Sequence, residues 1–317
     1  MRRILRVAPY LFALAFVVWC GLALRGDLVQ LSPLVLIQAW PVVLAAALLS
    51  LLNYALRIVR WRYYLARLGH PIAPWFAAIT FTAGFAYTVS PGKVGEMARA
   101  RYYISRGIPL SDVAAAFFGE RLLDLLVMVV LASLLLTSAS GYDSAVFGAA
   151  MLVLAALATL ATPWWPALAD RVRHWNVLPK PVQRGLQSIA TALASTRRLL
   201  VPSTLCVGFL LGLVAWGLEG LGLGILSSMF PGRHLEWVTA VGIYGVAVLL
   251  GGLSLLPGGL GSTEAVMTAL LAVQGYPLSR AVMITLTCRL VTLWFAVLLG
   301  WVAILSLRQR ASALEST

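Results

Sequence analysis

The chain has 317 residues, of which 61% are hydrophobic and 11% are charged, and its mean hydropathy is +0.91. This composition excludes a water-soluble globular protein, because apolar runs of roughly 20 residues, each long enough to cross a bilayer, recur along the chain. The net charge of +13 does not indicate nucleic-acid binding, because the basic residues occupy short segments between apolar runs, as the positive-inside rule describes for membrane proteins.

The first predicted span covers residues 7–24 and follows a cluster of arginines at the N-terminus. This run is longer than the apolar core of a secretory signal peptide, about 7–15 residues, so we expect it to be retained as a helix. A second span is predicted from about Pro33 to Leu56. Residues 57–67 then mix arginines with Trp61, Tyr63 and Tyr64, a composition typical of the membrane–water interface.

Residues 75–106 are predicted to form a re-entrant helical hairpin, which enters the membrane and returns to the same side. The apolar run 75–90 is short for a full span and is broken at Pro91-Gly92, because Pro and Gly interrupt helices. Residues 94–106 contain Glu96 and three arginines, too many charges to cross lipid alone. A break at this depth is stable only inside protein or beside a watery cavity.

Beyond this hairpin the sequence predicts further spans, a polar connection and a second hairpin. The spans are expected at 111–137, 145–162, 203–230 and 278–307. The connection, 163–202, includes a predicted amphipathic surface helix over 181–200. The second hairpin is expected at 237–274, broken at Pro257-Gly258. The predicted fold class is therefore an all-α integral membrane protein, with one polytopic membrane domain over 1–317, about six full transmembrane helices and two re-entrant hairpins.

The second hairpin repeats the first. Each Pro-Gly pair is followed by a glutamate (Glu96 or Glu264), then by Gly-x-Pro-Leu-Ser and Arg-Leu, and from the glutamates onward every matching position is offset by 168. Chance does not readily align so many spaced residues, so we interpret the pattern as an internal duplication. Its halves cover roughly 33–162 and 203–307 and are joined by the stretch 163–202.

The distribution of basic residues predicts the topology. With both hairpins re-entrant and both termini cytoplasmic, nineteen of the 24 Lys and Arg residues face the cytoplasm, including those of 163–202. Arg25, Arg233 and Arg280 lie outside, and Arg121 and Arg289 lie in the membrane. The hairpins then enter from opposite sides, so the duplication is an inverted repeat, a construction that many secondary transporters use around a midplane site.

Arg121 and Arg289 are both expected near the midplane. Each lies ten residues after the serine that opens its helix, a distance of about 15 Å and half of a hydrocarbon core of about 30 Å. A charge there costs roughly 2.5–3.5 kcal/mol and needs a partner or a function. Two interpretations stay open: the guanidiniums bind a phosphate-bearing headgroup, or each joins hairpin to helix by pairing with Glu96 or Glu264. Arg121 could also pair with Asp124.

Other charged residues at predicted membrane depth are Glu120, Asp124 and Glu219, which either carry protons for coupling or balance the arginines. Lys93 lies at the tip of the first hairpin, where backbone N–H groups also point outward, and could bind an anion. The alternative is a solvated interfacial lysine. The residues expected to bind substrate are Arg121, Arg289, Lys93, Glu96 and Glu264.

The sequence contains no Walker motif, no Ser-His-Asp or Cys-His set and no zinc-protease motif. The three cysteines lie alone in apolar runs and the three histidines lie in separate loops. We therefore predict no disulfide, no metal and no cofactor.

The chain resembles the transmembrane region of lysylphosphatidylglycerol synthases and their stand-alone, UPF0104-type relatives. The matching motifs are Arg60-Trp61 with Tyr64-Leu65, Pro91-Gly92-Lys93-Val94-Gly95-Glu96, Glu120-Arg121-Leu122 with Asp124, and Leu256-Pro257-Gly258-Gly259-Leu260-Gly261 through Glu264. The resemblance covers nearly the whole chain. It implies a protein of the bacterial-type cytoplasmic membrane that moves lipid headgroups across the bilayer.

In the full-length enzymes of this family a soluble aminoacyl-transfer domain follows the membrane part, whereas this sequence stops ten residues after its last predicted span. We therefore expect a transporter rather than an enzyme: a flippase-like translocase of an anionic phospholipid, glycolipid or polyprenyl-phosphate-linked lipid that uses no ATP. The alternative is a membrane subunit of, or accessory to, a lipid aminoacyl- or glycosyl-transferase. The expected partners are a membrane lipid and, in the alternative, a soluble or membrane transferase, but no nucleic acid.

Overall fold

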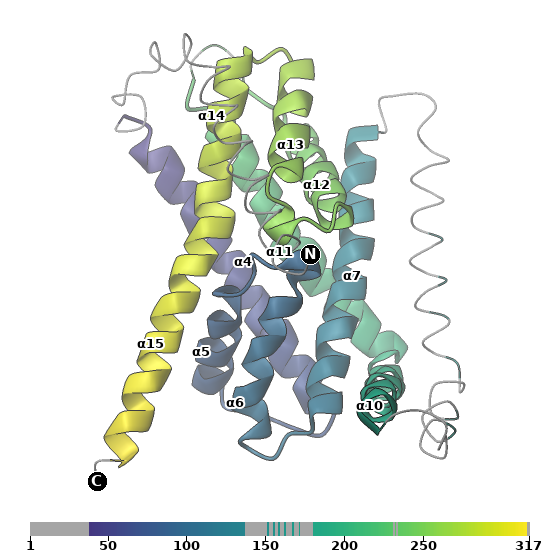
Figure 1. Ribbon diagram of the computed structural model, residues 1–317. Coiled ribbons are helices and arrows are strands. Elements are labelled where there is room, and N and C mark those ends of the chain that lie inside the picture. The colour runs from purple at the N-terminus through teal and green to yellow at the C-terminus, as the bar shows by residue number, and fades with distance from the viewer. Residues whose placement is uncertain are drawn as a thin grey trace, which may run out of the picture.

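The computed structural model describes residues 38–136 and 180–315, apart from residues 231 and 233, and a few isolated positions between 151 and 171. Every regular element in these residues is helical, as the sequence predicts (Figure 1). The predicted spans 7–24 and 145–162 and most of the polar connection lie outside the described residues.

Three helices in the described part of the chain are long and apolar enough to cross a membrane. They are α4 (Trp40–Arg67), α11 (Pro202–Ser227), and the continuous helix of α14 (Leu278–Arg289), η4 (Leu290–Trp294) and α15 (Phe295–Glu315). A fourth long helix, α7 (Leu110–Leu136), carries Glu120, Arg121 and Asp124 in its middle. These helices correspond to four of the predicted spans, but α4 continues through the arginine-rich segment 57–67.

Two short hairpins break at the Pro-Gly pairs. The first consists of α5 (Pro74–Phe85), the 3-10 helix η1 (Pro91–Arg99) and α6 (Ala100–Ile104), and the second of α12 (Trp237–Leu253), η3 (Pro257–Gly259) and α13 (Ser262–Val273). Helices α5 and α13 have 12 residues each, a length of about 18 Å, which is well short of a hydrocarbon core of about 30 Å.

The tips of the two hairpins meet in the middle of the bundle. In Figure 1 α5 and α6 occupy the lower half and α12 and α13 the upper half, and the backbone N–H of Gly258 donates to the Ser90 carbonyl at 3.5 Å. The second tip is built on glycines, because Gly258, Gly259 and Gly261 have φ of 62°, 66° and 85°, the left-handed region that L side chains rarely adopt. Lys93 in the first tip adopts the same conformation with φ 57°.

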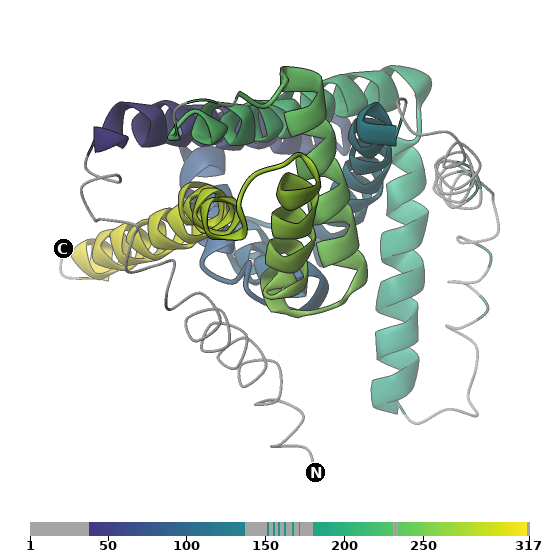
Figure 2. The same cartoon turned by 90° about the horizontal axis from the view of Figure 1, so that it is seen from above.

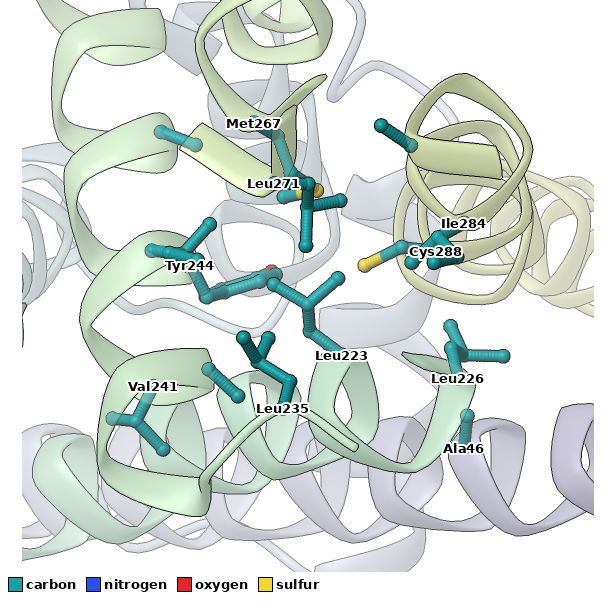
Figure 3. Packing of buried hydrophobic residues seen from close by; sticks show 14 of the residues in the cluster. Ala46, Leu223, Leu226, Leu235, Val241, Tyr244, Met267, Leu271, Ile284 and Cys288 are labelled. Carbon is teal, nitrogen blue, oxygen red and sulfur yellow. The ribbon is translucent and has the colours of Figure 1, made fainter. Parts of the chain in front are cut away.

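Helix α11 packs closely against its neighbours through its glycines. A Cβ atom at Gly220 would lie 2.7 Å from Val241 Cα, and one at Gly212 would lie 2.5 Å from Arg60 Nη1. The run of glycines on α11 is therefore explained by close helix packing. Side chains from α11, α12, α13 and α14, among them Leu223, Tyr244 and Cys288, form the larger apolar core (Figure 3).

The long C-terminal helix joins the two hairpins. Its upper part, α14, packs on α13, and its lower part, α15, packs on α5. Between them η4 is a π-helix, and its Thr292 carbonyl accepts a hydrogen bond from the Tyr54 hydroxyl. Helix α10 (Lys180–Thr196) ends in η2 (Arg197–Leu199) and packs against α7 at the edge of the bundle, crosswise to it (Figure 2), as a surface helix predicted over 181–200 would.

Candidate functional site

Four arginines and three carboxylates form a buried network in the bundle. Helix α4 contributes Arg57 and Arg60, η1 contributes Glu96 and Arg99, and α7 contributes Glu120, Arg121 and Asp124. Glu120 lies at the centre, 3.4 Å from Arg57, 3.2 Å from Arg60, 3.0 Å from Arg99 and 3.3 Å from Arg121. Asp124 accepts from Arg60 at 2.7 Å and from the Trp216 indole at 2.9 Å. The network thus fixes the first hairpin and α7 to α4.

The first half of the segment 57–67, which was expected to lie at the membrane–water interface, is buried inside the protein. Arg57 is 5% exposed and Arg60 is 0% exposed, since α4 continues and turns these side chains toward the carboxylates of α7. The signal that could have revealed this is the helical spacing of polar residues on one face of α4: Ser50, Asn53, Arg57, Arg60 and Tyr64. Arg99 was likewise missed, and its guanidinium lies 3.8 Å from the Trp61 ring and 4.3 Å from the Phe81 ring.

The pairing predicted from the 168-residue offset is confirmed in both halves. Arg121 lies 3.6 Å from Glu96, and Arg289 Nε donates to Glu264 at 2.6 Å. The second pair also holds the hairpin tip, because Arg289 Nη2 donates to the Gly258 carbonyl at 2.7 Å.

Arg121 differs from Arg289 in its hydrogen bonds. Its Nη2 forms ion pairs with Glu96, Glu120 and Asp124 at 3.3–3.6 Å, and its buried Nε has no hydrogen-bond acceptor in the described part of the chain. A buried donor without an acceptor costs about 1–3 kcal/mol. The Arg121 Nε therefore lacks an acceptor, whereas Arg289 donates both to Glu264 and to the Gly258 carbonyl.

A cavity of about 510 Å³ opens at the meeting point of the two hairpin tips. Its charged lining consists of Lys93, Arg121, Asp124 and Arg289, and its apolar lining includes leucines 249, 253, 255, 256 and 293 with Met128 and Val248. The volume lies within the usual range for small-molecule sites, about 300–1,000 Å³. A lining that combines three cations with many aliphatic side chains suits an amphipathic anion.

Lys93 points into the bundle rather than lying in a solvated interface. Its Nζ lies 5.2 Å from the centre of the Trp216 ring, and among the described residues no carboxylate oxygen lies within 4.0 Å of it. Of the residues expected to bind substrate, Lys93, Arg121 and Arg289 line the cavity, while Glu96 and Glu264 lie behind the arginines.

The three acids expected to carry protons do not lie together. Glu120 and Asp124 belong to the arginine network, whereas Glu219 on α11 accepts a hydrogen bond from Ser50 Oγ at 2.9 Å. Glu219 lines a separate small cavity of about 50 Å³, next to Tyr54, Tyr244 and Lys93. Within the described residues no group of three His, Cys, Asp or Glu side chains is arranged to hold a metal ion.

A family model matches the part of the chain that contains the whole site. The family described as the lysylphosphatidylglycerol synthase TM region matches residues 6–300, which include both hairpins, the arginine network and the cavity. A UPF0104 membrane protein of Methanothermobacter thermautotrophicus is 28% identical over 311 residues, covering 92% of this chain and 89% of that protein. A UPF0104 membrane protein of Pyrococcus horikoshii is 32% identical over 114 residues, covering 36% of this chain and 32% of that protein.

Proposed function

Because the chain belongs to the lysylphosphatidylglycerol synthase transmembrane-region family, we propose that this membrane protein is a lipid translocase. Its substrate is an anionic phospholipid, glycolipid or polyprenyl-phosphate-linked lipid, which it moves across the cytoplasmic membrane without ATP. The observation that carries this proposal is the cavity of about 510 Å³ between the hairpin tips, whose lining includes three cations, one acid and five leucines named above.

The balance of charge around the cavity supports an anionic substrate. The arginine network together with Lys93 contributes five positive charges, against the four carboxyl groups of Glu96, Glu120, Asp124 and, in the small cavity, Glu219. The pair of Arg289 and Glu264 adds nothing to this difference. Positive charge that is buried without a counter-ion is costly, so the site favours a ligand that brings negative charge.

The apolar wall of the cavity supports a lipid rather than a soluble anion. Leu253 and Leu255, at the tip of the second hairpin, are 63% and 68% exposed and continue the cavity lining toward the outside of the protein. Acyl or polyprenyl chains could remain against this apolar surface while the headgroup enters beside Lys93 and Arg121. A headgroup in this position exchanges its water for guanidinium, ammonium and backbone groups.

In the proposed topology both termini are cytoplasmic and the two hairpins are re-entrant from opposite sides, as an inverted repeat. The short lengths of α5 and α13 and the contact between Ser90 and Gly258 support it. The tips then meet near the midplane, where a headgroup has the greatest need of polar partners. Transport runs downhill or is coupled to an ion, for which Glu120, Asp124 and Glu219 are the candidate carriers.

The test is translocation of fluorescent phosphatidylglycerol by the purified protein in phosphatidylcholine liposomes. We expect the protein to equilibrate this lipid between leaflets and the Lys93→Gln variant to lose most of the activity. The matched control is Arg101→Gln, which removes an exposed charge on α6 far from the cavity lining. Transport at the unmodified rate by a folded Lys93→Gln variant would overturn the role of the cavity. Failure with every anionic lipid tried, with a transferase copurifying, would favour an accessory subunit instead.

A further inference from the structure

Glu219 stands apart from the other buried acids of the described chain. Glu96, Glu120, Asp124 and Glu264 each lie within 4.0 Å of an arginine, and Asp112 lies 2.9 Å from His70 and 3.5 Å from Arg198. Glu219 is 3% exposed, and no Lys or Arg nitrogen of the described residues lies within 4.0 Å of it. A carboxylate in this position is either neutral or dependent on more distant charge.

The groups that face Glu219 come from four elements. Helix α4 presents Ser50, Asn53, Tyr54 and Arg57, the first hairpin presents Lys93, α12 presents Tyr244, and α14 presents Cys288 and Arg289. Two of the three cations are committed elsewhere, because Arg57 lies 3.4 Å from Glu120 and Arg289 donates to Glu264 at 2.6 Å. Lys93 is therefore the cation near Glu219 that has no carboxylate of its own.

Lys93 also belongs to the linings of two cavities. It lines the small cavity of about 50 Å³ with Glu219, and it lines the cavity of about 510 Å³ with Arg121. Trp216, Arg289, Val248 and Leu293 are shared by the two linings as well. A headgroup anion in the large cavity and the carboxylate of Glu219 in the small one would thus both be stabilised electrostatically by the Lys93 ammonium group.

We propose that Glu219 is a proton-binding residue that takes up one proton when an anionic headgroup binds beside Lys93, so that lipid and proton move together. In this step a hydronium ion of the aqueous phase loses a proton and is left as water, and a carboxylate oxygen of Glu219 forms the new O–H bond. An anion added near Lys93 makes the surroundings of Glu219 less positive, which favours the neutral acid. By linkage, protonation of Glu219 strengthens binding of the anion by the same factor. The inference rests on the proposed function, since it takes the large cavity as the lipid site.

The first test measures binding of phosphatidylglycerol to the purified protein at a series of pH values, together with proton uptake in a weakly buffered solution containing a pH dye. We expect affinity to rise as pH falls, by at most about tenfold per pH unit, with uptake approaching one proton per bound lipid. In Glu219→Gln, affinity should be independent of pH and uptake should be absent, although the lipid still binds. Glu236→Gln, which changes an exposed acid before α12, should behave as the unmodified protein.

Ser50→Ala provides a second variant that keeps the carboxyl group. Ser50 donates to Glu219 at 2.9 Å and so favours its charged form, and its loss should move the midpoint of the pH dependence upward. Binding that is independent of pH in the unmodified protein, or a midpoint unchanged in Ser50→Ala, would overturn the role of Glu219 while leaving lipid transport intact. Absence of binding and transport for every anionic lipid would instead overturn the proposed function.

Discussion

At the scale of single residues, Lys93 and Gly259 are the most informative pair. They occupy equivalent places after the two Pro-Gly breaks, and both adopt the left-handed conformation, with φ of 57° and 66°. This conformation costs a non-glycine residue roughly 1–3 kcal/mol, and such residues cluster at functional sites. The second tip avoids this cost by using glycine, whereas the first tip keeps a lysine whose ammonium group reaches the cavity.

Replacing Lys93 by Gly should therefore separate stability from transport. The variant relieves the left-handed conformation, so we expect its melting temperature in detergent to be equal to or higher than that of the unmodified protein. Its lipid transport should fall at least tenfold, because the cation of the cavity that has no carboxylate within 4.0 Å is lost. Thermal unfolding and the liposome assay measure the two effects, and retention of full transport would show that strain at Lys93 serves another purpose.

A second prediction concerns the pair of Arg289 and Glu264. Changing either residue alone to Gln leaves a buried charge without its partner and should destabilise the protein by about 3–5 kcal/mol. The double variant should be less destabilised than the sum of the two single variants, because no charge is stranded. Unfolding of all three variants in micelles gives the coupling energy by a double-mutant cycle. Additive losses would show that the ion pair at 2.6 Å contributes no coupling.

The Glu96–Arg121 and Glu264–Arg289 pairs could be anticipated from the sequence, because the internal duplication shows that the glutamate and the arginine have the same spacing in both halves. It did not predict that Arg57 and Arg60 are buried, since an arginine-rich helix end with aromatic residues has the same composition in an interface and in a network. What decides between them is the partner, and Glu120 lies some 60 residues further along the chain. The isolation of Glu219 was equally hidden, because it depends on how α11 is rotated against α4.

At the scale of elements, the bounds of the two hairpins were well predicted because Pro and Gly mark the breaks in them. Helices α5 and α12 stop within a few residues of the predicted breaks, and α13 begins at the predicted residue, Ser262. The contact between the tips could not be predicted, since no local pattern states which loops meet. A hypothetical Cβ atom on Gly258 would lie 3.5 Å from Val89 Cα, so the tips are in direct contact.

A disulfide between the tips should arrest transport. We expect the Val89→Cys, Gly258→Cys variant, in a background without the native cysteines, to crosslink under oxidation because the positions are adjacent. Transport should stop when the bond forms and return when it is reduced. The single Gly258→Cys variant controls for strain at φ 62°. Undiminished transport by the crosslinked protein would mean that the tips need not separate.

At the scale of the whole molecule, the proposed inverted repeat gives the two halves opposite orientations. The base of the first hairpin and the base of the second lie at opposite ends of the bundle in Figure 1. The described halves are not equal, however. The first carries the network of four arginines, and the second a single pair of Arg289 and Glu264. The buried charges are consequently distributed unequally between the two described halves.

Labelling of single cysteines tests this orientation. Ser105 and Pro277 are exposed residues at the bases of the first and second hairpins, so Ser105→Cys and Pro277→Cys should leave the fold intact. In cells expressing variants without the native cysteines, an impermeant maleimide should modify position 277 from outside and reach position 105 only after permeabilisation. Labelling of both positions from the same side would contradict the inverted repeat.

The π turn at Leu290–Trp294 separates the two parts of the C-terminal helix that pack on different hairpins. Above it α14 is attached to the second hairpin, and below it α15 is attached to the first. Single π turns inside α-helices are frequent at functional sites, and this one begins one residue after Arg289, which lines the cavity. In the translocase that we propose, a bend of the C-terminal helix at this turn would change the position of one hairpin relative to the other.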